Sequence, residues 1–171
     1  MSDEMLAIWL LTAATIAFLC GFWLLPGGVL ALRRRAHGEM QVDLRPGYSS
    51  DTLYRLLGLY GTDGVQAFRR MLLADMLFPV VYAALLVQIG NLVGHSHPAV
   101  PRTASFLRMA AIAAASFDYL ENLFLLHVIR RLPSRRRLAA HAAGAFTSLK
   151  TFSLLGALVA LVVMLLSPRA G

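Results

Sequence analysis

Four long apolar stretches constrain this chain more than any other feature of its sequence. They lie at about residues 5–28, 71–93, 103–129 and 138–166. A helix needs about 20 mostly apolar residues to cross the hydrocarbon core of a bilayer, and each stretch meets that length. Soluble domains are about 45–50% apolar, whereas this chain is 58% hydrophobic. The sequence therefore predicts an all-α fold, a four-transmembrane-helix bundle.

The lengths of these stretches also determine the domain organisation. In a chain of 171 residues, four spans leave little room for a separate soluble domain. The backbone of a lipid-exposed segment must satisfy its own hydrogen bonds, and the stretches lack the alternation of barrel strands, so helices are favoured over a barrel. We therefore expect one integral membrane domain over residues 1–171.

The basic residues predict how the spans are oriented. The chain opens with Asp3 and Glu4 instead of the basic region of a signal peptide. Arginines concentrate in the first and third connections, at Arg33, Arg34, Arg35, Arg45, Arg55, Arg69 and Arg70 and at Arg130, Arg131, Arg135, Arg136 and Arg137. Basic loops stay in the cytoplasm, so both termini are expected outside. The net charge of +7 needs no nucleic acid to explain it, and these loops are expected to contact anionic lipid headgroups.

The connection between the first two spans, about residues 33–69, contains a helical pattern. Ser49, Ser50 and Asp51 supply N-cap chemistry. An apolar stripe with helical spacing follows, at Leu53, Leu56, Leu57 and Tyr60. The pattern predicts a short amphipathic cytoplasmic helix over residues 50–60. It would lie on the membrane surface, or fold beneath the bundle as a lid.

Charged residues inside the spans are the candidate functional residues. Asp118, Glu121 and Asn122 share one face of the third span, and Lys150 lies one turn beyond Thr147 on the fourth. A charge at mid-helix costs roughly 2.5–3.5 kcal/mol on insertion scales. The helical rise puts Lys150 at the depth of the two acids, so the sequence predicts that it pairs with Asp118 or Glu121.

The second span adds a further polar stripe. Asp75, Pro79 and Tyr82 stand on one face at helical spacing. Proline cannot donate to the carbonyl of residue 75, so a kink is expected beside the Asp75 carboxylate. Together with the third and fourth spans, this stripe predicts a polar pocket between spans 2, 3 and 4.

Several short motifs follow one another in a distinctive order. They are PGY (46–48), LYGTDG (59–64), DMLFPVVY (75–82), DYLEN (118–122) and TSLK (147–150). In this order the chain resembles a family of uncharacterised bacterial four-helix integral membrane proteins, over about residues 43–150. The resemblance implies a multi-pass protein of the bacterial inner membrane and supplies no activity.

The leading hypothesis is that the pocket binds a lipid-like or amphipathic small molecule, with acid–base chemistry by Asp118 and Glu121 as the catalytic pair. The pocket-binding residues would be Asp75, Tyr82, Asn122, Thr147 and Lys150. The alternatives are an accessory or assembly subunit whose polar residues only clasp the helices, and a proton-coupled carrier. Whether the protein is an enzyme, a homodimer or part of a larger complex stays open.

No cofactor or metal is expected. The pair His95 and His97 in the outer loop offers two ligands, which are too few for a closed zinc site.

Overall fold

The computed structural model describes residues 3–96 and 101–167, and the regular structure in that part of the chain is entirely helical. The elements are α1 (Asp3–Leu24), α2 (Val29–Arg35), the 3₁₀ turn η1 (Val42–Leu44), α3 (Ser50–Asp75), α4 (Phe78–Ser96), α5 (Pro101–Arg130) and α6 (Arg137–Leu166). Four segments are long and apolar enough to cross a membrane, namely α1 with α2, α3 with α4, α5, and α6. The predicted four-helix architecture is confirmed, and it indicates a multi-pass membrane protein.

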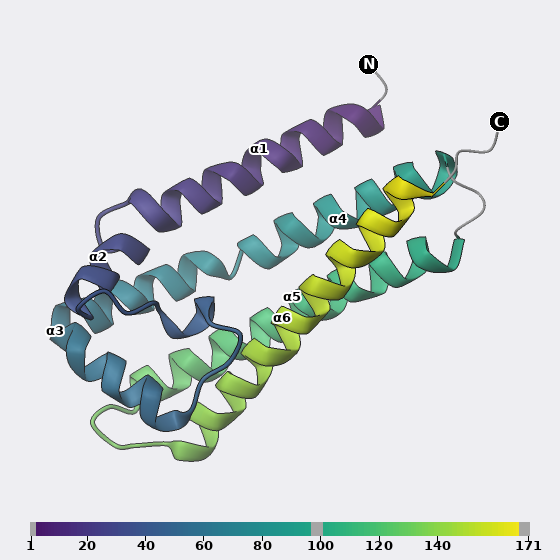
Figure 1. Ribbon diagram of the computed structural model, residues 1–171. Helices are drawn as coiled ribbons and strands as arrows, with labels where there is room; N and C mark the ends of the chain where they lie inside the picture. Colours follow the sequence, from purple (N-terminus) through teal and green to yellow (C-terminus); the bar gives the residue numbers. More distant parts are fainter. Residues whose placement is uncertain (1–2, 97–100, 168–171) are drawn as a thin grey trace.

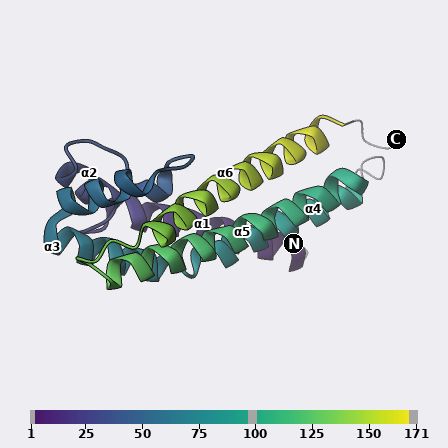
Figure 2. The same ribbon diagram turned by 90° about the horizontal axis from the view of Figure 1, so that it is seen from below.

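The long helices lie side by side along one axis (Figure 1). α5 and α6 pack against each other along most of their length, as Figure 2 also shows from below. α4 packs on α5, and α1 packs on α4. α1 makes its main contacts with α4, α6 makes its main contacts with α5, and α4 also touches α6, so α1 and α6 are the two outer helices of a curved row.

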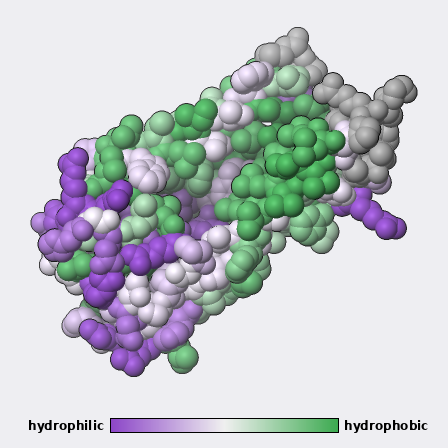
Figure 3. All heavy atoms as spheres, viewed as in Figure 1, coloured by the Kyte–Doolittle hydropathy of each residue, from purple (hydrophilic) through white to green (hydrophobic). Residues whose placement is uncertain are grey.

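One end of the bundle carries most of the short structure. α2, η1, α3 and the turn between α5 and α6 gather there, whereas the start of α1 and the end of α6 lie at the other end (Figure 1). Hydrophilic residues cluster on the former end and hydrophobic ones along the rest (Figure 3). Both arginine-rich connections therefore lie at the same end of the molecule, which we call the basic end.

α3 is the element that differs most from expectation. Its predicted N-cap is present, since Ser49 Oγ accepts a hydrogen bond from Thr52 N at 3.1 Å. The helix then continues past Tyr60 to Asp75, with a kink at Gly61. Gly61 has φ 65° and ψ −179°, a conformation that glycine adopts without the steric cost that a Cβ would add.

The apolar stripe of α3 is buried in protein. Leu53, Leu56 and Tyr60 are at most 1% exposed, in a core shared with the basic-end parts of α5 and α6. α3 thus folds beneath the bundle as a lid, which is the second of the two predicted positions. It covers the basic end, whereas no residue of α1 is buried.

Candidate functional site

A buried polar cluster is centred on Lys150 of α6. The Lys150 Nζ lies 2.5 Å from Glu121 Oε2 and 3.1 Å from Asp118 Oδ1, both on α5. The three side chains are 12%, 0% and 6% exposed. The predicted pairing of Lys150 is therefore confirmed, and the lysine bridges both acids instead of one.

Two hydroxyl groups complete the coordination of these acids. Thr147 Oγ1 donates to Glu121 Oε1 at 2.5 Å, and Tyr82 OH of α4 donates to Asp118 Oδ2 at 3.1 Å. Each carboxylate oxygen of the pair thus faces either the ammonium or a hydroxyl. Such complete pairing is what makes buried charges tolerable in a low-dielectric interior.

Asp75 belongs to a second, adjacent contact. It is the last residue of α3, and its Oδ2 accepts from Asn122 Nδ2 of α5 at 2.8 Å. The helix breaks at residues 76–77, and Pro79 then occupies the first turn of α4, where no helical N–H bond is lost. The expected kink beside Asp75 is therefore present.

The segment 39–48 closes the inner end of the cluster, and sequence reasoning did not place it there. Lys150 Nζ donates to the main-chain oxygen of Asp43 at 3.3 Å, and Gln41 Nε2 donates to Asp43 Oδ1 at 3.1 Å. Burial raises the pKa of the Asp43 carboxyl above its ordinary value, although the nearby Lys150 charge acts against that rise. The segment has no periodic pattern that would have predicted this position.

Two glycines allow this segment to approach α6 closely. A Cβ added to Gly144 would collide with the carbonyl oxygen of Tyr48, and one added to Gly47 would collide with Ser148 Oγ. Gly144 lies on α6, and its missing side chain makes room for the backbone of a loop. The position of Asp43 against Lys150 depends on this contact.

A cavity of about 670 Å³ starts at the polar cluster. Its inner part is lined by Asp43, Arg45, Asp75, Tyr82, Asp118, Lys150 and Thr151, and its outer part mainly by Thr15, Leu19, Phe22, Trp23, Phe78, Leu85, Leu86, Leu154, Leu155 and Leu158. Four lining residues are well exposed and mark the rim: Leu19 of α1, Leu155 and Leu158 of α6, and Leu44 of segment 39–48, at 43%, 55%, 52% and 45% exposure. The cavity therefore opens between α1 and α6, where the space-filling view shows a hollow (Figure 3).

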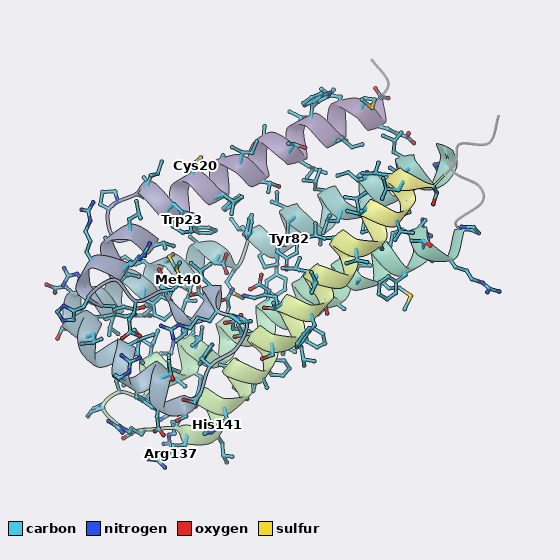
Figure 4. The ribbon with its side chains drawn as sticks, in the orientation of Figure 1. Cys20, Trp23, Met40, Tyr82, Arg137 and His141 are labelled. Atoms are coloured by element: carbon cyan, nitrogen blue, oxygen red, sulfur yellow. The ribbon has the colours of Figure 1, made fainter. Side chains whose placement is uncertain are left out.

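An aromatic wall joins α1 to the polar cluster. Phe22 of α1 meets Phe78 of α4 edge to face at a ring-centroid distance of 5.7 Å, and Phe78 meets Tyr82 at 5.2 Å. Tyr82 in turn donates to Asp118. Figure 4 shows Trp23 under the end of α1 and Tyr82 on α4, and both line the cavity.

The structure divides the sequence-predicted site residues into two groups. Asp75, Tyr82, Asp118 and Lys150 line the cavity. Glu121, Asn122 and Thr147 are fully buried behind them and do not line it. The pocket was expected between spans 2, 3 and 4, whereas α1 and segment 39–48 also contribute to its wall.

This division limits the chemistry that the cluster can offer. Of the predicted acid–base pair, only Asp118 is in contact with the cavity, and its two oxygens are held by Lys150 and Tyr82. A general acid or base must reach the atom with which it exchanges a proton. Glu121 therefore has no direct contact with the cavity and reaches its lining through Lys150.

No group of three or more His, Cys, Asp or Glu side chains able to hold a metal occurs in residues 3–96 and 101–167. Of the histidine pair considered from the sequence, His95 lies in the last turn of α4, and His97 lies outside the described residues.

The fold and the cluster define the class of the protein: a four-span membrane protein with a charged, hydrogen-bonded cluster at the inner end of an apolar cavity. Comparisons with protein-family models, with curated proteins and with solved structures give no match. The likeness of the short motifs to bacterial four-helix membrane proteins therefore stays a prediction.

Proposed function

We propose that this protein binds a lipid-like, amphipathic small molecule in the cavity between α1 and α6. One observation supports the proposal above all: a single cavity has charged groups at its inner end and apolar side chains along the rest. Its volume of about 670 Å³ falls within the range of roughly 300–1,000 Å³ that is usual for small-molecule sites. An amphipathic molecule would place its head at the polar end, beside Asp75 and Asp118, and its tail toward Leu158.

The cavity-lining polar residues receive distinct roles in this proposal. Asp118, Tyr82 and Asp75 contact the head of the ligand, because they line the inner end. Glu121 and Thr147 position Lys150 from behind. If a reaction follows binding, Asp118 exchanges the proton with the ligand, and Glu121 sets the position and charge of Lys150.

The proposal includes a location. The resemblance and the arginine distribution favour a bacterial inner membrane, with the basic end in the cytoplasm and both termini outside. Arginines at the basic end, such as Arg33 and Arg137, would contact anionic headgroups there. The cavity mouth then opens sideways into the bilayer, because exposed apolar residues line it.

Mass spectrometry of co-purifying molecules tests the proposal. We expect an amphiphile to remain bound through purification in mild detergent and to be lost when Leu158 at the mouth is changed to Trp. Leu165→Trp is the matched control, because Leu165 is 60% exposed on the same helix and does not line the cavity. Equal amounts of every amphiphile in the wild type and in both variants would contradict the proposal.

A second candidate function is an accessory subunit in which the polar cluster only clasps the helices. It is favoured by Glu121, Asn122 and Thr147, which are buried and hydrogen-bonded and do not line the cavity. This alternative predicts that Leu158→Trp changes neither the bound molecules nor the biological activity. Substitutions of buried residues that do not line the cavity, such as Thr147→Val, would instead lower stability, and any loss of activity would follow that loss of stability.

A further inference from the structure

The cavity contains more acidic than basic side chains. Asp43, Asp75 and Asp118 line it, together with only two bases, Lys150 and Arg45. Lys150 is shared between Asp118 and the buried Glu121. An acidic group without an ion-pair partner in a low-dielectric wall favours a bound cation or hydrogen-bond donor.

Arg45 does not correct this imbalance. Its Nη2 lies 3.1 Å from Glu39 Oε2, and its Nε and Nη2 donate to the main-chain oxygen of Met40 at 3.0 and 2.9 Å. The guanidinium is therefore already paired within segment 39–48. Within the described part of the chain, neither Asp43 nor Asp75 forms an ion pair.

Asp75 offers a ligand a direct contact. Its Oδ2 accepts from Asn122, whereas its Oδ1 has no hydrogen bond to any residue within 3–96 or 101–167. The side chain lines the cavity. An acceptor without a donor at this position matches a head group that donates hydrogen bonds or carries positive charge.

Aromatic rings line the same cavity as these acids. Phe22, Trp23, Phe78 and Tyr82 line the same cavity, and Phe78 makes edge contacts with the rings of Phe22 and Tyr82. Aromatic faces attract ammonium groups, and aromatic walls combined with carboxylates are the usual recognition chemistry for substituted ammonium ions. Figure 4 shows Trp23 and Tyr82 on the two helices that border this part of the cavity.

We infer that the amphipathic ligand carries a cationic head: an amine or a substituted ammonium group on a single apolar chain. The inference rests on the proposed function and specifies the ligand of the same cavity. The head lies against Asp75 and the aromatic wall, and the chain leaves between α1 and α6. A carboxylate head would instead face three acids and meet one lysine that is already shared.

The two tryptophans of the chain provide the assay. Trp23 lines the cavity, whereas Trp9 is 61% exposed and does not line it. In a Trp9→Phe variant in nanodiscs of zwitterionic lipid, fluorescence reports Trp23 alone. Three probes with the same brominated chain are titrated, with a trimethylammonium, an alcohol or a carboxylate head. A Trp23→Phe variant, which retains Trp9, measures quenching by probe that is merely dissolved in the bilayer.

We expect the ammonium probe to quench Trp23 at about one tenth of the concentration that the carboxylate probe requires, a difference that corresponds to about 1.4 kcal/mol. Asp75→Asn should remove most of that preference. Asp63→Asn, which removes one acid from an exposed position of the same helix, should retain it. Thermal unfolding of each variant confirms that it is folded before it is titrated.

The outcomes separate the two proposals. If the three probes quench Trp23 equally, and more strongly than they quench Trp9 in the Trp23→Phe control, the cavity binds amphiphiles. That result would refute the cationic head. A preference for the carboxylate probe also refutes the cationic head, and so does a preference for the ammonium probe that Asp75→Asn leaves unchanged. If no probe quenches Trp23 beyond the control, the proposed function fails together with this inference.

Discussion

The basic end and the α1 side of the molecule are built in opposite ways. At the basic end, α3 seals the ends of α5 and α6, and residues such as Leu56, Phe68 and Leu125 have 0% exposure. On the other side, α1 packs mainly on α4 and buries none of its residues. In a bilayer, lipid covers what protein does not. The tightly packed basic end therefore holds the charged cluster in place. The cavity opens beside α1, which is packed less tightly.

Breaking the charged cluster should give the largest effect. Lys150→Met leaves Asp118 and Glu121 without their cation, and removal of one partner from a buried pair costs about 3–5 kcal/mol. We expect a marked fall in the melting temperature in mild detergent. The measurement is thermal unfolding of the purified protein followed by tryptophan fluorescence.

The control for this variant follows from the bridging geometry. Because Lys150 contacts both acids, the double variant with Asp118→Asn still contains one unpaired carboxylate. Recovery of stability should require Glu121→Gln as well. Full recovery by the double variant would show that the contact with Glu121 does not contribute.

A matched pair of leucines tests the comparison directly. Leu56→Ala at the basic end should cost about 2–5 kcal/mol, the usual range for a buried leucine. Leu10→Ala on α1 should change stability by about 0.5 kcal/mol or less, because Leu10 is 62% exposed and its surroundings are lipid or detergent. Similar losses in unfolding free energy for the two variants would mean that α1 is packed in the native membrane.

A pair of glycines probes the joint between segment 39–48 and α6. Gly144→Ala should cost about 1–3 kcal/mol, because the new Cβ would collide with the Tyr48 carbonyl and push Asp43 away from Lys150. Gly58→Ala, where a Cβ would meet nothing within 4 Å, should be neutral or slightly stabilising. Chemical unfolding in mixed micelles would measure the free energy of unfolding of both variants. An equal loss for both would refute a close contact between segment 39–48 and α6.

The smallest effect is expected from the exposed ion pairs of Glu39. Arg55 and Arg45 hold the pKa of Glu39 at about 2, below its ordinary value of 4.5. Because the folded-state pKa is lowered, the contribution to stability is complete above pH 4.5 and is lost as the pH falls toward 2. We expect Glu39→Gln to lower the melting temperature slightly at pH 7. The difference from the wild type should disappear near pH 2, and a difference that grows on acidification would contradict this account.

The main parts of the fold could be predicted from the sequence because a bilayer imposes a length and a polarity on every span. The pairing of Lys150 followed from the same physics, since helical rise places it at the depth of Asp118 and Glu121. That Lys150 bridges both acids depends on side-chain directions, which spacing alone does not provide.

Two parts of the site were beyond sequence reasoning. Segment 39–48 lacks helical or strand periodicity, so nothing indicated that Asp43 would reach Lys150. α1 carries apolar residues on every side, and such a helix does not reveal from its sequence which of its faces lines a cavity. The length of α3 was also underestimated, because glycines at positions 58, 61 and 64 suggested an end where the helix only kinks.

The pairing across α5 and α6 has a consequence for biogenesis. α1 is synthesised before the other three spans, and its threonines need no partner, since Thr12 and Thr15 donate to carbonyls of their own helix at 2.8 Å. The acids of α5, in contrast, need a partner on another helix. That partner is Lys150 of α6, and α6 is synthesised after α5. We therefore expect α5 to remain in the insertion machinery until α6 emerges, and the two to enter the lipid together as a hairpin.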